Sequence, residues 1–425
     1  MTCAMSSKIV APRGTQDFLP PETGRWQELE SRIHVLAHRY GYGEIRTPMF
    51  EATELFVRGV GETTDIVEKE MYTFVDKGDR SMTLRPEFTA PVMRAALQSN
   101  LFAQGPQRLY YIGPIFRYER PQAGRYRQSH QFGIECTGFA GPEADVEVIA
   151  LAVHLFRSYG LTTELNINSI GDDECRPRYR EALLAHFRPH VTSLSEDSQR
   201  RLERNPLRLL DSKAPQDQPF LDSAPKFEDR LCDACREHFE SVKQYLTQLG
   251  IPFSVNPRIV RGLDYYTRTV FEFVSGALGA QSTVCAGGRY DDLIKSLGGP
   301  DVPAVGFALG LERLLTTIAA AGASPEMERS GIQVIALGAQ ARGVLVILSA
   351  LLRYALSIPI FMDFDDRKLL AQLKTADRNN ARYALIVGTD ELQAGEAVLR
   401  DLAERTDTRL TLGKDLVPQL VEMVG

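Results

Sequence analysis

The sequence predicts a chain of mixed α and β structure in three parts. Residues 1–170 alternate strand-like and helix-like runs, and strand-like runs return over 258–325. Between them, residues 171–257 are charged, rich in helix-forming residues and broken by prolines, which predicts an inserted helical domain. Beyond a linker-like stretch, three β-rich runs separated by two helical segments predict a small α/β domain over 331–425.

The N-terminal part is predicted to begin with a helix over 26–40, because its apolar residues recur at helical spacing and a Gly-Tyr-Gly stop follows. A strand over 44–48 comes next. Proline lacks a backbone donor, so Pro48 should end the pairing of that strand. The chain then turns into a helix that contains residues 55–56.

A second strand and helix follow, over 82–85 and through 93–97. Pro86 fits the first position of this helix, where a missing backbone N–H costs nothing. The prediction therefore places Glu87 and Thr89 in the first helical turn, close to the end of the strand.

A hairpin crowded with arginines is predicted over 110–135. Two apolar, strand-like flanks hold a polar loop. The loop carries four arginines against one acid: Arg117, Arg120, Arg125, Arg127 and Glu119. Because a guanidinium is permanently charged and can hold two oxygens at once, this cluster predicts the binding of a polyanion such as a nucleoside triphosphate.

The return strand of this hairpin has two different faces. Side chains alternate along a strand, so Gln131, Gly133 and Glu135 share one face, while Phe132 and Ile134 share the other. The glycine predicts room for a ligand against the sheet, with Gln131 and Glu135 as hydrogen-bonding walls. An ordinary solvent-exposed sheet face is the alternative.

Later strands are predicted over 258–274, 282–286 and 304–310, after a helix over 143–159 and a strand over 165–170. Arg261 lies at the mouth of the first. Tyr265 and Tyr266 follow it and could wall a pocket, although at least one of two adjacent tyrosines commonly packs in a core.

Glycines recur near the later strand ends, at Gly287-Gly288 and at Gly306 and Gly310, and a helix over 311–318 carries Arg313 in its first turn. A helix start favours phosphate, although an arginine there is often only solvated. Because the chain has no GxxxxGK[ST] loop and no GxGxxG after a strand, nucleotide binding would depend on arginines over an antiparallel sheet.

The bulk composition indicates an ordinary globular protein with 44% hydrophobic residues. A net charge of −6, from 49 basic and 55 acidic side chains, gives no global sign of nucleic-acid binding. The sequence has no apolar run of about 18 residues and no signal or transit peptide pattern. We therefore expect a cytoplasmic protein with no membrane association.

The six cysteines are too few and too scattered for a disulfide framework, which suits a reducing compartment. Cys232 and Cys235 form the one CxxC, and His238 follows three residues later. Without a second pair this is a weak sign of zinc, and residues 228–248 read as one helix. We interpret these cysteines as structural or incidental, with a metal site as the less favoured alternative.

Three segments resemble the motifs of the class II aminoacyl-tRNA synthetases: the strand around Pro48, residues 116–135 and residues 306–313. Two more, RGLDYYTRTVFEF over 261–273 and AGGRYDDL over 286–293, resemble signatures of the histidine-specific family within that class. The resemblance covers nearly the whole chain.

The resemblance implies an α+β catalytic domain, with an antiparallel sheet flanked by helices, over 1–170 and 258–325. It also implies the helical insertion over 171–257, a C-terminal anticodon-binding α/β domain over 331–425, and a homodimer. The last region has 11 basic and 12 acidic residues, so its anticodon-binding role depends on the resemblance and not on charge.

The activity implied by the resemblance is the ligation of L-histidine to its cognate tRNA, tRNA(His). ATP and histidine would form histidyl-adenylate with release of pyrophosphate, and Mg²⁺ would bridge the phosphates. Glu87, Thr89 and Gln131 would hold the histidine α-amino group. Glu135 and Tyr266 would recognise the imidazole, and the residues implied to line the pocket beside them are Tyr265 and Tyr290.

The phosphate and tRNA contacts are implied by the same resemblance. Arg117 and Arg261 would act at the α-phosphate as the catalytic residues, and Arg125 and Arg313 would bind the outer phosphates. The residues implied to face the tRNA acceptor end are Arg120 and Gln122. One departure is Phe88, which stands where many relatives have a small residue.

Two rival functions remain open. The first is a regulatory subunit of ATP phosphoribosyltransferase that binds histidine without charging tRNA. Such paralogues typically lack the C-terminal domain and the arginine motifs, whereas this chain keeps Arg117, Arg261 and Arg313. The second rival, a synthetase for another amino acid, is disfavoured by residues 261–273.

Overall fold

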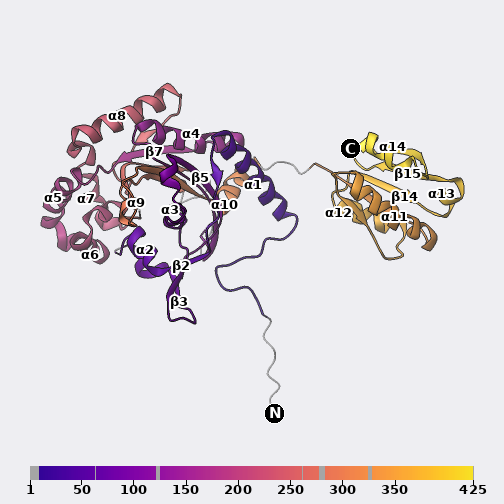
Figure 1. Ribbon diagram of the computed structural model, residues 1–425, viewed down its shortest axis with the longest axis horizontal. Coiled ribbons are helices and arrows are strands. Elements are labelled where there is room, and N and C mark those ends of the chain that lie inside the picture. Colours follow the sequence, from indigo (N-terminus) through magenta and orange to yellow (C-terminus); the bar gives the residue numbers. More distant parts are fainter. Residues whose placement is uncertain are drawn as a thin grey trace, which may run out of the picture. The chain divides into compact units, whose positions relative to one another are not determined.

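The chain divides into two compact units, Met1–Ser324 and Pro325–Gly425, each described here by itself. The computed structural model describes residues 9–62, 64–120, 125–260, 262–276, 283–323 and 328–424. Figure 1 shows the ribbon of both units. Within the described residues, no helix is both long and apolar enough to cross a membrane.

The first unit is built on an eight-stranded sheet with the order β1-β5-β6-β11-β10-β9-β7-β8. Its strands are β1 (Gly43–Glu44), β5 (Gln107–Phe116), β6 (Gln128–Thr137), β7 (Glu164–Ser169), β8 (Ser254–Val255), β9 (Thr267–Val274), β10 (Thr283–Arg289) and β11 (Ala304–Gly310). The six central strands pair antiparallel, and β1 and β8 add parallel pairs at the two edges.

A three-stranded antiparallel sheet and ten α-helices accompany the large sheet among the described residues of this unit. The small sheet consists of β2 (Phe50–Ala52), β4 (Ser81–Leu84) and β3 (Tyr72–Val75). The helices are α1 (Glu22–Arg39), α2 (Thr53–Val60), α3 (Thr89–Gln98), α4 (Pro142–Ser158), α5 (Cys175–Phe187), α6 (Glu196–Arg204), α7 (Gln218–Asp222), α8 (Asp233–Gln248), α9 (Leu293–Ser296) and α10 (Leu311–Ala320).

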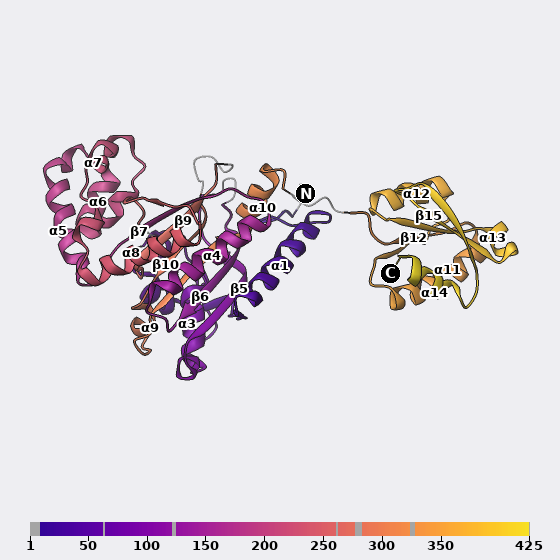
Figure 2. The same ribbon diagram turned by 90° about the horizontal axis from the view of Figure 1, so that it is seen from above.

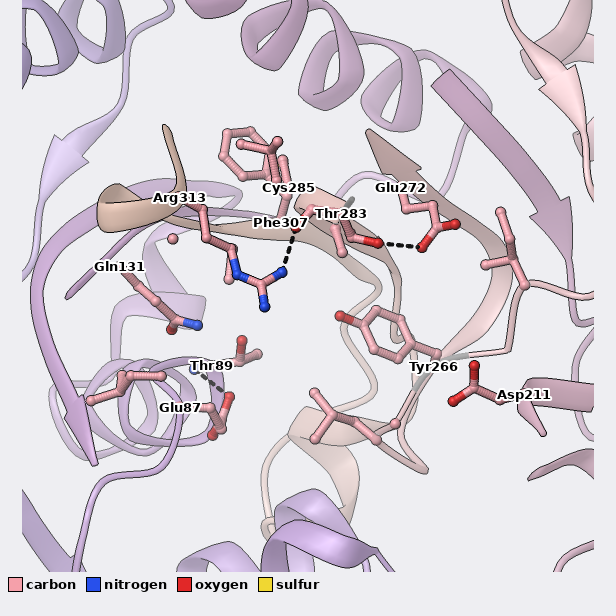
Figure 3. A pocket seen from close by; sticks show the side chains of 18 of the residues that line it. Glu87, Thr89, Gln131, Asp211, Tyr266, Glu272, Thr283, Cys285, Phe307 and Arg313 are labelled. Carbon is pink, nitrogen blue, oxygen red and sulfur yellow. Dashed lines mark hydrogen bonds between the residues drawn. The ribbon is translucent and has the colours of Figure 1, made fainter. Parts of the chain in front are cut away.

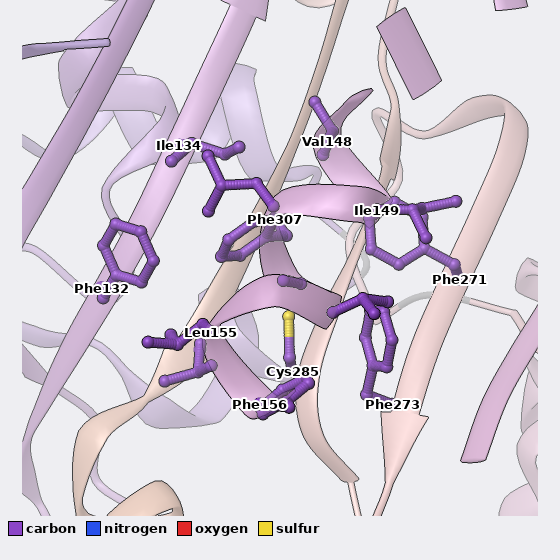
Figure 4. Packing of buried hydrophobic residues seen from close by; sticks show 14 of the residues in the cluster. Phe132, Ile134, Val148, Ile149, Leu155, Phe156, Phe271, Phe273, Cys285 and Phe307 are labelled. Atoms are coloured by element: carbon purple, nitrogen blue, oxygen red, sulfur yellow. The ribbon is translucent and has the colours of Figure 1, made fainter. Parts of the chain in front are cut away.

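Helices α1, α4 and α8 contribute to one apolar core with the large sheet (Figure 2). Leu155 and Phe156 of α4 pack there with Phe132, Phe273 and Phe307 of the strands (Figure 4). Because Phe132 points into this core, its neighbours Gln131 and Gly133 must face the opposite side of the sheet. The predicted alternation of β6 is therefore confirmed.

Helix α3 begins at Thr89, so the prediction that Pro86 opens this helix is wrong. The Glu87 carboxylate accepts hydrogen bonds from the backbone N–H groups of Thr89 at 2.7 Å and Ala90 at 2.9 Å. A carboxylate in this position satisfies amides that a helix start leaves without partners. Glu87 therefore precedes the helix instead of lying in its first turn.

Two other predicted boundaries differ from the structure. Strand β9 begins at Thr267, later than the predicted start at residue 258. Gly287 and Gly288 lie inside β10 and not after it. A Cβ at Gly287 would overlap the backbone oxygen of Gly306 on the paired strand, so close strand approach explains this glycine.

Between β7 and β8 the described regular elements are all helical. Helices α5 to α8 are joined by shorter turns, including the 3₁₀ turn Phe227–Arg230. The predicted single helix over 228–248 is wrong because the chain is extended at Leu231 and Cys232, and α8 starts only at Asp233. Cys232 consequently lies outside the helix that contains Cys235.

The second unit has a five-stranded sheet with the order β13-β12-β14-β15-β16. Its elements are β12 (Ile332–Ala336), α11 (Ala339–Ala355), β13 (Ile360–Met362), α12 (Leu369–Arg378), β14 (Tyr383–Val387), α13 (Thr389–Ala394), β15 (Glu396–Asp401), β16 (Thr406–Thr411) and α14 (Leu416–Val424). The first three strands pair in parallel, as the predicted alternation of strands and helices requires. The antiparallel hairpin of β15 and β16 was not predicted, because β16 is mostly polar and exposed.

Candidate active site

A cavity of about 730 Å³ lies on the face of the large sheet that carries Gln131 and Glu135 (Figure 3). Its walls include every residue predicted to bind histidine and three of the predicted arginines: Glu87, Thr89, Gln131, Glu135, Tyr265, Tyr266, Tyr290, Arg117, Arg125 and Arg313. Residues more than two hundred positions apart in the chain therefore meet in one site.

Three further residues were predicted to belong to the site. Arg261 and Gln122 lie outside the described residues. Arg120 is exposed and does not line the cavity. The roles predicted for these three residues remain predictions.

Glu135 is the most buried carboxylate of the cavity, with 1% of its surface exposed. Thr89 Oγ1 donates to its Oε1 at 2.8 Å, Tyr111 Oη donates to the same oxygen at 3.3 Å, and Tyr290 Oη donates to Oε2. Burial raises the pKa of Glu135 to about 8, although these hydrogen bonds oppose the shift. The carboxyl can therefore gain or lose a proton near neutral pH.

Glycines make room for these contacts. A Cβ at Gly306 would overlap Glu135 Oε2, so only glycine at that position of β11 leaves space for the carboxylate. A Cβ at Gly133 would overlap the hydroxyl of Tyr111. The prediction that Gly133 leaves room for a ligand is wrong, because the Tyr111 phenol fills that space.

Tyr111 is a cavity residue that sequence reasoning missed. It pairs with Gly133 across the β5–β6 ladder, and its ring stacks on Phe88 with 4.2 Å between centroids. Phe88 is buried and also lines the cavity, so it shapes the wall through its stacking on Tyr111. The pairing of a glycine with a large aromatic residue could have revealed this contact from the sequence, since an aromatic side chain often covers a glycine on the neighbouring strand.

Three tyrosines form the wall beside Glu135. The ring centroids of Tyr265 and Tyr266 are 4.8 Å apart, and those of Tyr265 and Tyr290 are 5.5 Å apart. Burial and the neighbouring Glu135 raise the pKa of Tyr290 well above its ordinary value, so its hydroxyl stays protonated and donates to Glu135. This wall combines ring surface with hydrogen-bonding hydroxyls, as a small aromatic ligand requires.

The Gln131 side chain points into the cavity (Figure 3). Its Oε1 is buried and has no hydrogen-bond partner among the described residues. A buried acceptor without a partner costs about 1–3 kcal/mol. A ligand that brings a donor, such as an ammonium group, would remove that cost.

Two of the three predicted arginines in the cavity flank one acid, Glu119. Arg125 lies 3.2 Å and Arg117 lies 3.8 Å from oxygens of Glu119, while Arg313 donates to the Thr283 carbonyl at 2.7 Å. Burial, and then the charge of Arg125, lower the pKa of Arg313. Cations that repel one another in a partly buried site favour a polyanionic ligand.

Glu312 is a second residue that sequence reasoning missed. Its buried carboxylate accepts from the backbone N–H of His130 at 2.9 and 3.0 Å and contacts the His130 ring nitrogen Nδ1 at 2.9 Å. This contact joins the start of α10 to β6. It therefore holds Arg313, the next residue, beside the strand that carries Gln131.

This arrangement, an antiparallel sheet that carries an arginine-lined cavity on one face and helices on the other, is the fold of a class II aminoacyl-tRNA synthetase. The family model described as histidyl-tRNA synthetase matches residues 14–314, and that described as anticodon binding domain matches 333–421. The chain belongs to the histidyl-tRNA synthetase family. The predicted family and fold class are both confirmed.

Individual relatives are similar to this chain over nearly its full length. The chain is 51% identical to the histidine–tRNA ligase of Desulforudis audaxviator over 96% of this chain and 97% of that one. It is also 51% identical to the histidine–tRNA ligase of Geobacillus sp. strain WCH70, over 94% of this chain and 96% of that one. Its structure is similar to the crystal structure of apo S. aureus histidyl-tRNA synthetase, with a TM-score of 0.82, 38% identity and coverage of 98% and 100%.

Proposed function

We propose that this chain ligates L-histidine to tRNA(His) in two steps, through a histidyl-adenylate formed from ATP with release of pyrophosphate. Membership of the histidyl-tRNA synthetase family supports the reaction. The single observation in the structure that supports it most is the arrangement of the cavity. A buried polar end at Glu135 and Gln131 lies in the same cavity as the arginines Arg117, Arg125 and Arg313.

The polar end of the cavity would bind histidine. The Gln131 oxygen without a partner and the Glu87 carboxylate can both accept from an α-ammonium group, although Glu87 already accepts from two backbone amides. Glu135, with its pKa near 8, can pair with an imidazole nitrogen, and the tyrosine wall can cover the ring. An amino acid without a matching donor and acceptor would leave these buried groups unsatisfied.

The arginine end would bind ATP. The histidine carboxylate attacks the α-phosphorus, so the reaction needs alignment and charge stabilisation, and no protein nucleophile. Arg117 and Arg261 would stabilise the α-phosphate, while Arg125 and Arg313 would hold the outer phosphates. Glu119 would release its arginine partners to the phosphates as ATP enters.

The cavity also has oxygen ligands that fit Mg²⁺. Glu119 and Glu272 both line it, and Mg²⁺ in nucleotide sites is commonly held by one or two carboxylates together with phosphate oxygens. When bound, the ion would neutralise part of the phosphate charge.

The third substrate, the tRNA, and the assembly are also part of the proposal. Arg120 and Gln122 would contact the acceptor end of the tRNA, and residues 331–425 would bind its anticodon. We propose the division into a catalytic domain over 1–170 and 258–325 and an insertion over 171–257. We further propose that the protein is a cytoplasmic homodimer.

A histidine-dependent exchange of pyrophosphate into ATP tests this function. We expect exchange with histidine and aminoacylation of tRNA(His). Absence of exchange would favour the regulatory subunit, and exchange with another amino acid would favour a different synthetase. Gln131→Ala should raise the KM for histidine by about ten- to a hundredfold, from the loss of about 1–3 kcal/mol, while Gln128→Ala on the same strand serves as the matched control.

A further inference from the structure

Four candidate metal ligands gather outside the cavity, at the base of the helical segment: Asp172, Cys175, Cys232 and Cys235. Their ligand atoms all lie within 4.8 Å of one another. Cys175 and Cys235 are buried, and all three cysteines are free thiols. None of these four residues lines the cavity, and none has a role in the proposed reaction.

The chain brings this cluster together from two distant places. Asp172 lies in the turn after β7, and Cys175 is the first residue of α5. Cys232 immediately precedes α8, and Cys235 lies in its first turn. The extended backbone at Cys232 is what brings its side chain to the same point as Cys235. The cluster thus joins the first and the last helix of the segment.

The contacts within the cluster resemble a ligand shell. The backbone N–H of Cys232 donates to Cys175 Sγ at 3.1 Å, and Cys235 Sγ lies 3.0 Å from Asp172 Oδ2. A tetrahedral site with Zn–S bonds of about 2.3 Å places its ligand atoms about 3.8 Å apart, so only small shifts would be needed. Thiolates with a fourth nitrogen or oxygen ligand are typical of structural zinc.

Positive charges in the surroundings can offset the negative charge of such a site. Three thiolates and a carboxylate exceed the charge of one Zn²⁺ ion. Arg268 Nη2 lies 3.8 Å from Asp172 Oδ2 and supplies a positive charge. The N-termini of α5 and α8 both point their partial positive charge at the cluster.

We propose that Asp172, Cys175, Cys232 and Cys235 bind one Zn²⁺ ion that fastens the two ends of the helical segment to each other. The proposed site is also linked to the cavity through a neighbouring residue. Arg176, next to Cys175, donates a hydrogen bond to the backbone carbonyl of Tyr266, which lines the cavity wall. The metal would therefore hold α5 against the segment that leads into β9, where this tyrosine lies.

Metal analysis of the full-length protein, purified without chelator, tests the proposal. Inductively coupled plasma mass spectrometry should find about one zinc per chain, since a structural site is closed and retains its ion. Cys175→Ser and Cys235→Ser should lose most of it. Cys136→Ala, at a buried cysteine of the sheet core, is the matched control and should keep its zinc.

Cobalt substitution gives a readout that does not depend on how well the variants fold. The metal-depleted natural chain, given Co²⁺, should develop the thiolate-to-cobalt charge-transfer absorption of a tetrahedral site. Wild-type protein with no zinc and no such absorption would overturn the proposal. The proposal would also be overturned if the protein contained iron and inorganic sulfide in place of zinc. A disulfide between two of these cysteines in protein purified under reducing conditions would overturn it as well.

Discussion

Thr89 Oγ1 donates a 2.8 Å hydrogen bond to Glu135 Oε1 and thereby joins the start of helix α3 to strand β6. Both residues are buried, so water does not compete for the contact. This bond connects two residues predicted to hold different ends of the histidine molecule, Thr89 the α-amino group and Glu135 the imidazole. The contact therefore fixes these two residues directly against each other.

Replacing the Thr89 hydroxyl should destabilise the fold. Thr89→Val leaves a buried carboxylate oxygen with one donor fewer, which should lower the free energy of unfolding by about 1–3 kcal/mol. Thr89→Ser keeps the hydroxyl and should stay much closer to the natural protein. Urea denaturation measures both, and equal stability of the two variants would contradict the role of this bond.

The stability of the protein should decrease as the pH rises toward 8, through Glu135. The folded state raises the pKa of this group from 4.5 to about 8, so between these values the folded protein keeps a proton that the unfolded chain has released. Glu135→Gln removes this titration. With each pH unit, the free energy of unfolding of this variant should rise relative to that of the natural protein by up to about 1.4 kcal/mol.

Thermal or urea unfolding from pH 5 to pH 8 measures this difference. Glu164→Gln, at an exposed carboxylate of β7, is the control and should run parallel to the natural protein. If the difference in the free energy of unfolding between Glu135→Gln and the natural protein stayed constant across this range, the raised pKa of Glu135 would be refuted.

Two glycines of β11 should respond very differently to an added methyl group. In Gly306→Ala the new Cβ would overlap Glu135 Oε2 and the Ile134 carbonyl, so we expect a loss of about 1–3 kcal/mol and a weaker affinity for histidine. In Gly310→Ala the nearest atoms belong to Arg313 at 3.6 Å, an ordinary contact. Unfolding experiments and the KM for histidine compare the pair; similar effects in both would refute the steric argument.

Removing the partner of a buried arginine should be among the most damaging changes. Arg289 and Asp145 are both fully buried and form a direct ion pair. Asp145→Asn leaves the buried Arg289 charge with only the partly exposed Asp291 as a partner and should cost about 3–5 kcal/mol. Asp291→Asn removes the other carboxylate near Arg289. Because the Asp291 side chain is 24% exposed, this change should lower the free energy of unfolding by less. Chemical denaturation of both variants checks the order.

Arg261→Ala should cripple adenylate formation and leave the fold intact. Loss of one preorganised charge contact commonly costs about 2.7–4 kcal/mol of transition-state stabilisation, or about a hundred- to a thousandfold in rate. Pyrophosphate exchange measures the loss, circular dichroism checks the fold, and Arg180→Ala on the exposed surface of α5 is the control. Near-normal exchange would rule the role out.

The sequence by itself determined the periodic features of this protein. Alternation placed Gln131 and Glu135 on one face of β6 and Phe132 on the other, because side-chain direction along a strand is a local property. The motifs determined the family. The helix start at Thr89 was misplaced, because the Glu87 carboxylate that caps it acts through side-chain geometry and not through pattern.

Only the tertiary structure decided which side chains meet. Tyr111 fills the space left by Gly133, and Cys175 lies beside Cys235 although sixty residues separate them. Contacts between distant segments depend on how the strands pair and on where the helices end, and a single sequence read locally does not contain that information. The cavity was therefore predictable from its motifs, while the cysteine cluster became visible only once the chain was folded.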